Sequence, residues 1–217
     1  MRDLAEIQLR RVRAHLVLEP ELSLIDSGYA GDGPRIRGAI ETHGRAAGDL
    51  RRVVITHGHP DHAGSAAELA AAGATILIHP ADAEGLRRTW QDVVRAPSRG
   101  GVFAAMTPPL EDFQPIEDGE ILPILGGLRV VHTPGHTPGS VCLYGARDRI
   151  LFVGDTLEAR FGRVSYASGL YSDDRAAAKR SVKRLADLDV ETIVFSHYPV
   201  LRKGAGEVLA RLATQAG

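Results

Sequence analysis

The segment Thr56-His57-Gly58-His59-Pro60-Asp61-His62 places three imidazoles and one carboxylate within six positions. It directly follows the apolar run Arg52–Ile55, which is typical of a buried strand. Alternate side chains of a strand share one face, so His57 and His59 at its end can point the same way, while Asp61 and His62 come from the turn that follows. Imidazole nitrogens and carboxylate oxygens suit zinc and are also accepted by iron and manganese. Four candidate ligands exceed the three that one catalytic metal usually takes from protein, so we predict two metals.

This segment and four others resemble the motifs of the metallo-β-lactamase superfamily. His-x-His-x-Asp-His at residues 57 to 62 is similar to the family's signature, and the five similar segments occur in the family's order across residues 24 to 199. The other four resemble the motif that supports the site from behind, the isolated histidine motif, the motif of the metal-bridging aspartate and the last histidine motif: Leu24–Gly28, Thr133–Ser140, Phe152–Thr156 and Ser196–Pro199.

The resemblance implies a ligand for every position of a dinuclear site. The first metal would be held by His57, His59 and His136, the second by Asp61, His62 and His197, and Asp155 would bridge them. A single histidine is more commonly a core or surface residue, but these residues fall jointly on the motif positions. Asp26 would hydrogen-bond a ligand or the loop that carries it. A strand-terminal aspartate before Ser-Gly could instead merely shape a turn.

Composition sets the expected partners and location. The 217 residues include 26 basic and 27 acidic side chains, so no bias toward nucleic acid is expected, and the expected partner is a small-molecule substrate. The sequence does not define the oligomeric state. Met1–Leu18 has no continuous apolar stretch, so neither a signal peptide nor a membrane anchor is expected. The single Cys142 cannot form an internal disulfide, which is consistent with a reducing cytoplasm.

Short β-rich runs alternate with helical stretches, which predicts an α/β domain over residues 1–217 with two mixed sheets packed together and helices outside. The resemblance implies a four-layer αββα sandwich with the metals at one edge of the sheets. Ser172 is the expected N-cap of the fourth helix. Strands are expected at residues 7–11, 14–18, 22–25, 52–56, 75–78, 121–125, 128–132, 141–144, 150–153 and 192–196, and helices at 34–42, 63–72, 81–88, 173–188 and 205–215.

The segment Trp90–Gly119 is the least regular part of the chain, with four prolines and a Gly-Gly pair. Long irregular segments inside compact domains are often lids or binding loops. A substrate lid and an ordinary surface excursion therefore both remain open for residues 90–119.

A dinuclear hydrolase is the function that these residues favour. Adjacent cations stabilise hydroxide, lowering the pKa of water from 15.7 to about 7 in the known single-zinc case. The expected nucleophile is a metal-bridging hydroxide on two zinc ions per chain, with iron or manganese as alternatives. Asp61 could orient this water and carry a proton.

The resemblance narrows the substrate only to a class. An aspartate at position 155 resembles the thioesterase, lactonase and phosphodiesterase branches, which favours a small ester, thioester or lactone. Glyoxalase II enzymes have similar metal motifs but add a helical C-terminal region, whereas about 20 residues follow His197 here. Tyr198 stands where the family commonly has glycine, and its phenol could act catalytically as a donor to an oxyanion or could simply pack.

One other enzyme class remains open. Persulfide dioxygenases are similar in fold and ligand set, so the alternative is a non-haem iron oxidoreductase. A non-catalytic binding module is less favoured because the ligand set is complete.

Overall fold

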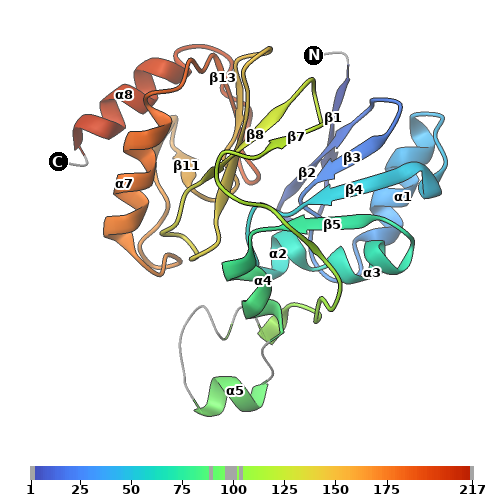
Figure 1. Cartoon of the computed structure of the whole chain (residues 1–217). Coiled ribbons are helices and arrows are strands. Elements are labelled where there is room, and N and C mark those ends of the chain that lie inside the picture. Colours follow the sequence, from blue (N-terminus) through green and yellow to red (C-terminus); the bar gives the residue numbers. More distant parts are fainter. Residues whose placement is uncertain (1–2, 88–89, 96–101, 103–104, 216–217) are drawn as a thin grey trace. The chain divides into compact units, whose positions relative to one another are not determined.

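The computed structural model describes residues 3–87, 90–95, 102 and 105–215. The chain divides into two compact units, Met1–Ile116 (unit 1) and Glu117–Gly217 (unit 2). Each unit contains one main sheet and its own helices (Figure 1).

Unit 1 is built on a six-stranded mixed sheet with its strands in sequence order, β1 to β6. The first three strands pair antiparallel, and β3 to β6 pair parallel. Parallel strands need crossover connections, and helices provide them here. The strands are β1 Leu4–Gln8, β2 Arg13–Val17, β3 Leu22–Ile25, β4 Leu50–Val54, β5 Thr75–Ile78 and β6 Gln114–Pro115. The helices are α1 Gly33–Thr42, the 3-10 turn η1 Ala47–Asp49, α2 Pro60–Ala63, α3 Ala66–Ala71, α4 Pro80–Leu86 and α5 Trp90–Arg95.

The core of unit 1 explains the apolar runs in its central strands. Val53 of β4 lies in the hydrophobic cluster that also contains Ile36 of α1 and Leu69 of α3. Its neighbour Val54 points to the other face of the sheet and is also fully buried. Strands that are buried on both faces read as continuous apolar runs, which is why this run identified a strand in the sequence.

Unit 2 is built on a five-stranded mixed sheet with the order β13-β10-β9-β8-β7. Only β10 and β13 pair parallel, and a separate hairpin is formed by β11 and β12. Val182 of α7 and Leu209 of α8 share a buried cluster with Leu151 of β10. The strands are β7 Ile121–Leu122, β8 Leu128–His132, β9 Val141–Gly145, β10 Ile150–Phe152, β11 Leu157–Arg160, β12 Arg163–Tyr166 and β13 Thr192–Val194; the helices are α7 Arg175–Leu185 and α8 Ala205–Gln215.

The expected class, with two mixed sheets and flanking helices, is confirmed, but several elements differ from the prediction. The helix expected at residues 63–72 is shortened to α3, and the separate turn α2 precedes it. The Gly64 N–H, which lies between them, donates to Gly28 O. A Cβ at Gly64 would lie 2.3 Å from Pro60 O, so only glycine fits this close approach. The short β6 and the β11–β12 hairpin were not predicted from the sequence.

The predicted N-cap of α7 is wrong by two residues. Asp174 caps the helix, accepting hydrogen bonds from Ala176 N at 2.8 Å and Ala177 N at 2.9 Å. The Ser172 hydroxyl instead donates to Ser168 O at 2.9 Å. Both residues are good caps, and the competing local hydrogen bond of the serine decides between them.

The segment 90–119 contains α5 and ends in contact with the rest of unit 1. Phe113 packs against the core of unit 1, and buried Thr107 donates a hydrogen bond to Gly58 O at 3.3 Å. Met106 is exposed. Residues 96–101, 103 and 104 lie outside the described residues, so the lid at 90–119 stays a prediction.

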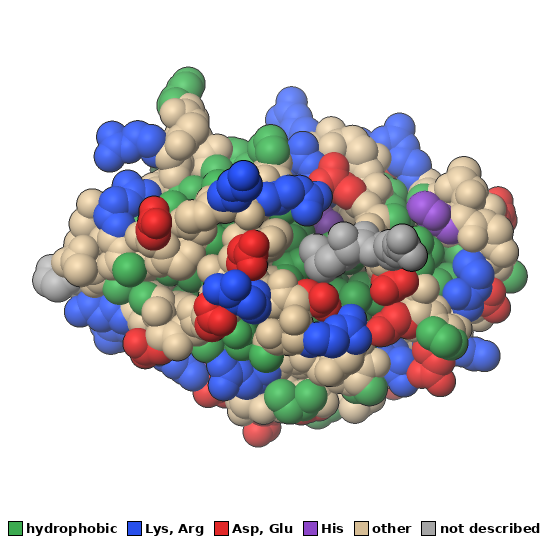
Figure 2. Space-filling model, turned by 90° about the horizontal axis from the view of Figure 1, so that it is seen from above, with side chains coloured by type: hydrophobic (Ala, Val, Ile, Leu, Met, Phe, Trp, Pro, Cys, Tyr) green, Lys and Arg blue, Asp and Glu red, His purple; other side chains and the backbone are tan. Residues whose placement is uncertain are grey.

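The surface and the helices give two further observations. Acidic and basic side chains are interspersed on the face seen in Figure 2, without a patch of one sign. Among the described residues, every helix is too short or too polar to cross a bilayer.

Candidate metal centre

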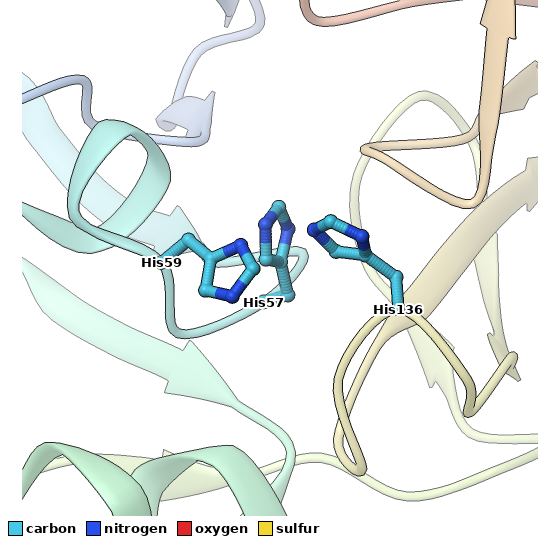
Figure 3. Close-up of side chains that lie close together, drawn as sticks. All are labelled: His57, His59 and His136. Carbon is cyan, nitrogen blue, oxygen red and sulfur yellow. The ribbon is translucent and has the colours of Figure 1, made fainter. Parts of the chain in front are cut away.

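The histidine-rich loop of unit 1 begins where β4 ends. His59 has extended backbone angles, φ −72° and ψ 153°, as the residue before a proline must, and Pro60 then opens α2. The loop carries His57 and His59 side by side, with ring centroids 4.7 Å apart (Figure 3). The ring centroids of His57 and His62 lie 4.0 Å apart. All three rings are buried. The potential ligand atoms of His57 and His59 lie within 4.8 Å of each other, and so do those of His57 and His62.

Asp61 and His62 form a second pair of donors in the first turn of α2. Oδ2 of Asp61 lies 3.7 Å from Nε2 of His62. The Asp61 carboxylate is partly exposed, and its charge reaches Tyr29. Burial and then this charge raise the pKa of the Tyr29 phenol above its ordinary value.

Asp26 supports the loop from the end of β3. Its fully buried carboxylate accepts from Thr56 N at 2.8 Å and from the Thr56 hydroxyl at 2.9 Å. Oδ2 of Asp26 also lies 2.8 Å from Nδ1 of His62. Because an ionised carboxylate can only accept, this contact favours the tautomer that has its proton on Nδ1, which leaves the lone pair of a neutral His62 ring on Nε2.

Two further residues hold the same loop: Asp82, which was missed from the sequence, and Ser27, which belongs to the supporting motif Leu24–Gly28. Asp82 of α4 is buried and accepts from Gly58 N at 2.7 Å. Ser27 donates through both its backbone N–H and its hydroxyl to His62 O, at 2.7 and 2.8 Å. Asp82 is 24 residues from Gly58, and an aspartate in the first turn of a helix carries no sequence signal for such a contact.

His136 of unit 2 lies in a tight turn after β8 (Figure 3). Thr133 N donates to Ser140 O at 2.8 Å and closes the turn, and Thr137 N donates to the Ser140 hydroxyl at 3.0 Å. Gly135 has a φ of +138°, and a Cβ there would lie 2.2 Å from Ala178 N of α7. The close approach of α7 therefore requires glycine at position 135, and the His136 ring that follows is buried.

Asp155 and His197 are brought together by strand register. Phe152 of β10 pairs with Val194 of β13 in a parallel ladder. Asp155 and His197 each follow three residues later, so they leave the same edge of the sheet side by side. Asp155 Oδ1 lies 3.3 Å from Nε2 of His197, and its Oδ2 lies 3.7 Å from Nε2 of His136. One carboxylate thus reaches both histidines of unit 2 that are expected to bind metal, His136 and His197.

Tyr198, next to His197, is not isolated. Its hydroxyl accepts a hydrogen bond from Arg160 Nε at 3.3 Å, and its ring makes an edge contact with Phe195 at a centroid distance of 6.1 Å. The bond to Tyr198, followed by the charge of Glu158, raises the pKa of Arg160 above its ordinary value. Arg160 was not identified from the sequence, because it is 38 residues from Tyr198.

Cys142 offers no nucleophile to this region. The side chain is fully buried on β9, and burial raises the pKa of its thiol to about 11. The thiol is therefore protonated at neutral pH, and the reactive thiolate is absent.

Comparison with known proteins identifies the family. A profile described as the metallo-beta-lactamase superfamily matches residues 19–197. Over 205 residues the chain is 29% identical to the uncharacterized protein YobT of Bacillus subtilis, covering 88% of this chain and 84% of YobT. It is 37% identical over 119 residues to acyl-coenzyme A thioesterase MBLAC2 of Bos taurus, covering 48% of this chain and 40% of that protein. A hydroxyacylglutathione hydrolase of Hahella chejuensis is 30% identical over 175 residues, or 79% of this chain and 54% of the hydrolase.

The chain therefore spans about half or less of the length of the thioesterase and of the hydroxyacylglutathione hydrolase described above. Among solved structures, the metallo-beta-lactamase family protein TTHA1429 from Thermus thermophilus matches 99% of this chain and 79% of its own, with a TM-score of 0.77 and 22% identity. TTHA1623 in a di-iron-bound form matches 96% of this chain and 97% of its own, with a TM-score of 0.71 and 29% identity. These likenesses confirm the expected αββα fold class. The chain belongs to the metallo-beta-lactamase superfamily.

Proposed function

We propose that this chain is a metal-dependent hydrolase of a small thioester, ester or lactone. The observation that carries the proposal is the position of Asp155, whose two carboxylate oxygens lie 3.3 and 3.7 Å from the imidazoles of His197 and His136. A carboxylate that reaches two histidines with different oxygens has the geometry that a ligand shared between two cations needs.

The donor set fits two metal ions. Under this proposal His57, His59 and His136 would hold the first ion, Asp61, His62 and His197 would hold the second, and Asp155 would be shared between them. Imidazole and carboxylate donors suit zinc, which we propose as the metal, and they also suit iron and manganese. The buried support of His62 by Asp26 favours such a role, because metal-ligating histidines commonly donate their other N–H to a carboxylate.

When bound, two adjacent metal ions lower the pKa of water and polarise the bond that is to be cleaved. Asp61 is the carboxylate that would accept a proton from the attacking water and pass it to the departing group, since it is partly exposed at the start of α2. Tyr198 would donate its O–H to the oxyanion that develops on the substrate. Arg160, which donates to the same phenolic oxygen, leaves that O–H free to point away from the guanidinium.

A thioester is the substrate class that we favour within this group. Two relatives act on thioesters according to their names, acyl-coenzyme A in one case and hydroxyacylglutathione in the other. The buried, protonated Cys142 excludes a covalent thiol route of hydrolysis through the chain's only cysteine. The proposal includes a cytoplasmic location, where thioesters of this kind are formed.

The second candidate is a non-haem iron oxidoreductase, such as a persulfide dioxygenase. The observation that favours it is the similar structure that contains two iron ions, at 29% identity. The same histidines and aspartates would serve as ligands, so geometry does not separate the two functions. Metal identity and oxygen uptake separate them.

The test combines metal analysis with turnover. Protein purified without added metal should contain about two zinc ions per chain and hydrolyse S-acetyl-N-acetylcysteamine, with activity lost to a chelator and regained with zinc. Asp155→Asn should lose metal and activity together, whereas Asp148→Asn, an acidic residue in the β9–β10 turn of the same unit, should change neither. Iron with oxygen uptake on a persulfide would replace the hydrolase by the oxidoreductase. Protein that binds neither metal tightly would refute both.

A further inference from the structure

The β11–β12 hairpin begins two residues after Asp155 and has an unfavourable turn. Its two turn residues, Phe161 and Gly162, both have positive φ, +50° and +73°. This pattern is that of a two-residue type I′ turn, in which Asn-Gly is the preferred sequence. A bulky aromatic residue with positive φ is a strained exception. The tip therefore carries phenylalanine where the fold would favour asparagine.

The side chains at the tip add to this local strain instead of relieving it. Phe161 is fully exposed, with an exposed fraction of 102%, so it gains nothing from burial. Arg160 and Arg163 are paired directly across the hairpin, and like charges in this position repel. Glu158 lies 3.2 Å from Arg160, but Arg163 has no ion-pair partner within the part of the chain that the structure describes. The contacts with Glu158 and Tyr198 account for Arg160, but neither packing nor ion pairing within the described part of unit 2 explains Phe161 and Arg163.

The chemistry of this tip matches one kind of ligand. Guanidinium groups bind phosphate by paired hydrogen bonds, and an exposed aromatic ring stacks on a base. A ligand that combines a base with phosphates would therefore satisfy Phe161, Arg160 and Arg163 together.

The hairpin also connects this tip to the proposed metal centre within unit 2. Arg160 Nε lies 3.3 Å from the Tyr198 hydroxyl, and Tyr198 follows the ligand His197. The four residues of β11 span about 13 Å at roughly 3.3 Å per residue. A substrate whose phosphates are joined to the thioester by a long arm would contact both the hairpin tip and the proposed metal centre.

We propose that the hairpin tip Arg160–Arg163 binds the phosphate-bearing nucleotide of a thioester's leaving group, as found in a nucleotide-carrying thiol. This inference rests on the proposed hydrolase function for the thioester, but the tip would bind its nucleotide whether or not the thioester is cleaved. Arg163 contacts phosphate, and Phe161 stacks on the base. Arg160 lies between the two regions, so that it contacts both the phosphate and the Tyr198 hydroxyl.

The first test measures binding without turnover. Adenosine 3′,5′-diphosphate, which has no thiol to bind metal, is titrated into the full chain by calorimetry. Arg163→Gln should weaken its binding about tenfold, and Phe161→Asn about five- to tenfold. Phe161→Asn also restores the preferred turn sequence, so its melting temperature should not fall. Arg180→Gln, an exposed arginine of α7 in the same unit, serves as the matched control and should leave binding unchanged.

The second test compares two thioesters with the same acyl group. Both tip variants should raise KM about tenfold for acetyl-coenzyme A and leave kcat/KM for S-acetyl-N-acetylcysteamine unchanged, because only the first carries the nucleotide. If wild type hydrolyses the short thioester but both variants bind the diphosphate as wild type does, the proposal for the tip is overturned and the hydrolase stands. If the variants lose diphosphate binding but wild type cleaves neither thioester, the tip stands and the hydrolase fails. A tip that binds anionic vesicles and no diphosphate would also overturn the proposal.

Discussion

Asp26→Asn is the substitution that best isolates how the fold prepares a ligand. The native carboxylate is fully buried and faces three donors. Thr56 N and the Thr56 hydroxyl lie 2.8 and 2.9 Å from Oδ1, and His62 Nδ1 lies 2.8 Å from Oδ2. Asparagine keeps the volume but has one accepting oxygen. If that oxygen stays on Thr56 N, the amide N–H₂ faces His62 Nδ1 and forces the imidazole proton onto Nε2, the atom that would bind metal.

The expected magnitudes follow from these contacts. One buried donor that loses its acceptor costs about 1–3 kcal/mol, so Asp26→Asn should destabilise the protein by about that amount. Asp26→Ala would remove the acceptor of all three donors, so it should destabilise the protein more than Asp26→Asn does. Loss of a carboxylate behind a metal-binding histidine typically lowers metal affinity by about 10- to 100-fold, which sets the expected effect on the second metal.

Three measurements test this reasoning. Denaturant unfolding gives the stability, competition with a chromophoric chelator gives the metal affinity, and nitrogen-detected histidine spectra of the metal-free protein give the tautomer of His62. Asp112→Asn, an exposed acid of unit 1, is the control and should change none of them. If Asp26→Asn kept wild-type metal affinity within a factor of about two and kept the Nδ1-protonated tautomer, the orienting role of Asp26 would be refuted.

Substitutions at three other residues, and removal of metal, test the site and the fold. Asp155→Ala should reduce occupancy of both metal sites and abolish turnover, and elemental analysis that finds a fully active protein with one tightly bound metal would exclude the dinuclear mechanism. Tyr198→Phe should lower kcat about a hundredfold, or roughly 3 kcal/mol, at unchanged metal content if the phenol reaches the oxyanion; a rate within about twofold of wild type would assign it to packing. Asp174→Ala should lower the melting temperature at pH 7, whereas Asp174→Asn should retain most of the cap. The N–H of Ala177 is the largest of the influences that hold the pKa of Asp174 below its ordinary value, so this difference between aspartate and alanine should be present at neutral pH and fade as the pH falls below about 4. Chelation should lower the melting temperature of the wild type, because bound metal stabilises only the folded state, and an unchanged melting curve after verified metal removal would contradict this.

The sequence predicts the parts of this protein that depend on local pattern. The apolar run before His57 identified β4, because strands buried on both faces leave an uninterrupted signal. The segment around His136 was identified by its resemblance to a family motif, and the structure shows that Gly135 of this motif has a positive φ. The split between α2 and α3 was not predictable in this way, because it depends on Gly64 meeting a loop 36 residues earlier in the chain.

Residues that act through long-range contacts were hidden for the same reason. Asp82 and Arg160 look like ordinary polar residues of a helix and a strand, and only their partners Gly58 and Tyr198 give them a role. The hairpin was missed because Phe161 occupies the turn position where asparagine would have signalled it. Sequence patterns thus find the donors more readily than the residues that orient them.

Burial divides the proposed ligands into two classes with different consequences. His57, His59, His62 and His136 are at most 8% exposed, whereas the side chains of Asp61, Asp155 and His197 are between 19% and 24% exposed. Buried donors hold their geometry because packing and hydrogen bonds restrict their rotamers, as the turn around His136 does. Exposed donors can be approached by substrate and water, and Tyr198 and the hairpin lie next to one of them, His197. We therefore expect substrate to arrive at the more exposed donors. The same region contains Tyr198, where the family commonly has glycine, and Phe161, where the hairpin turn would favour asparagine.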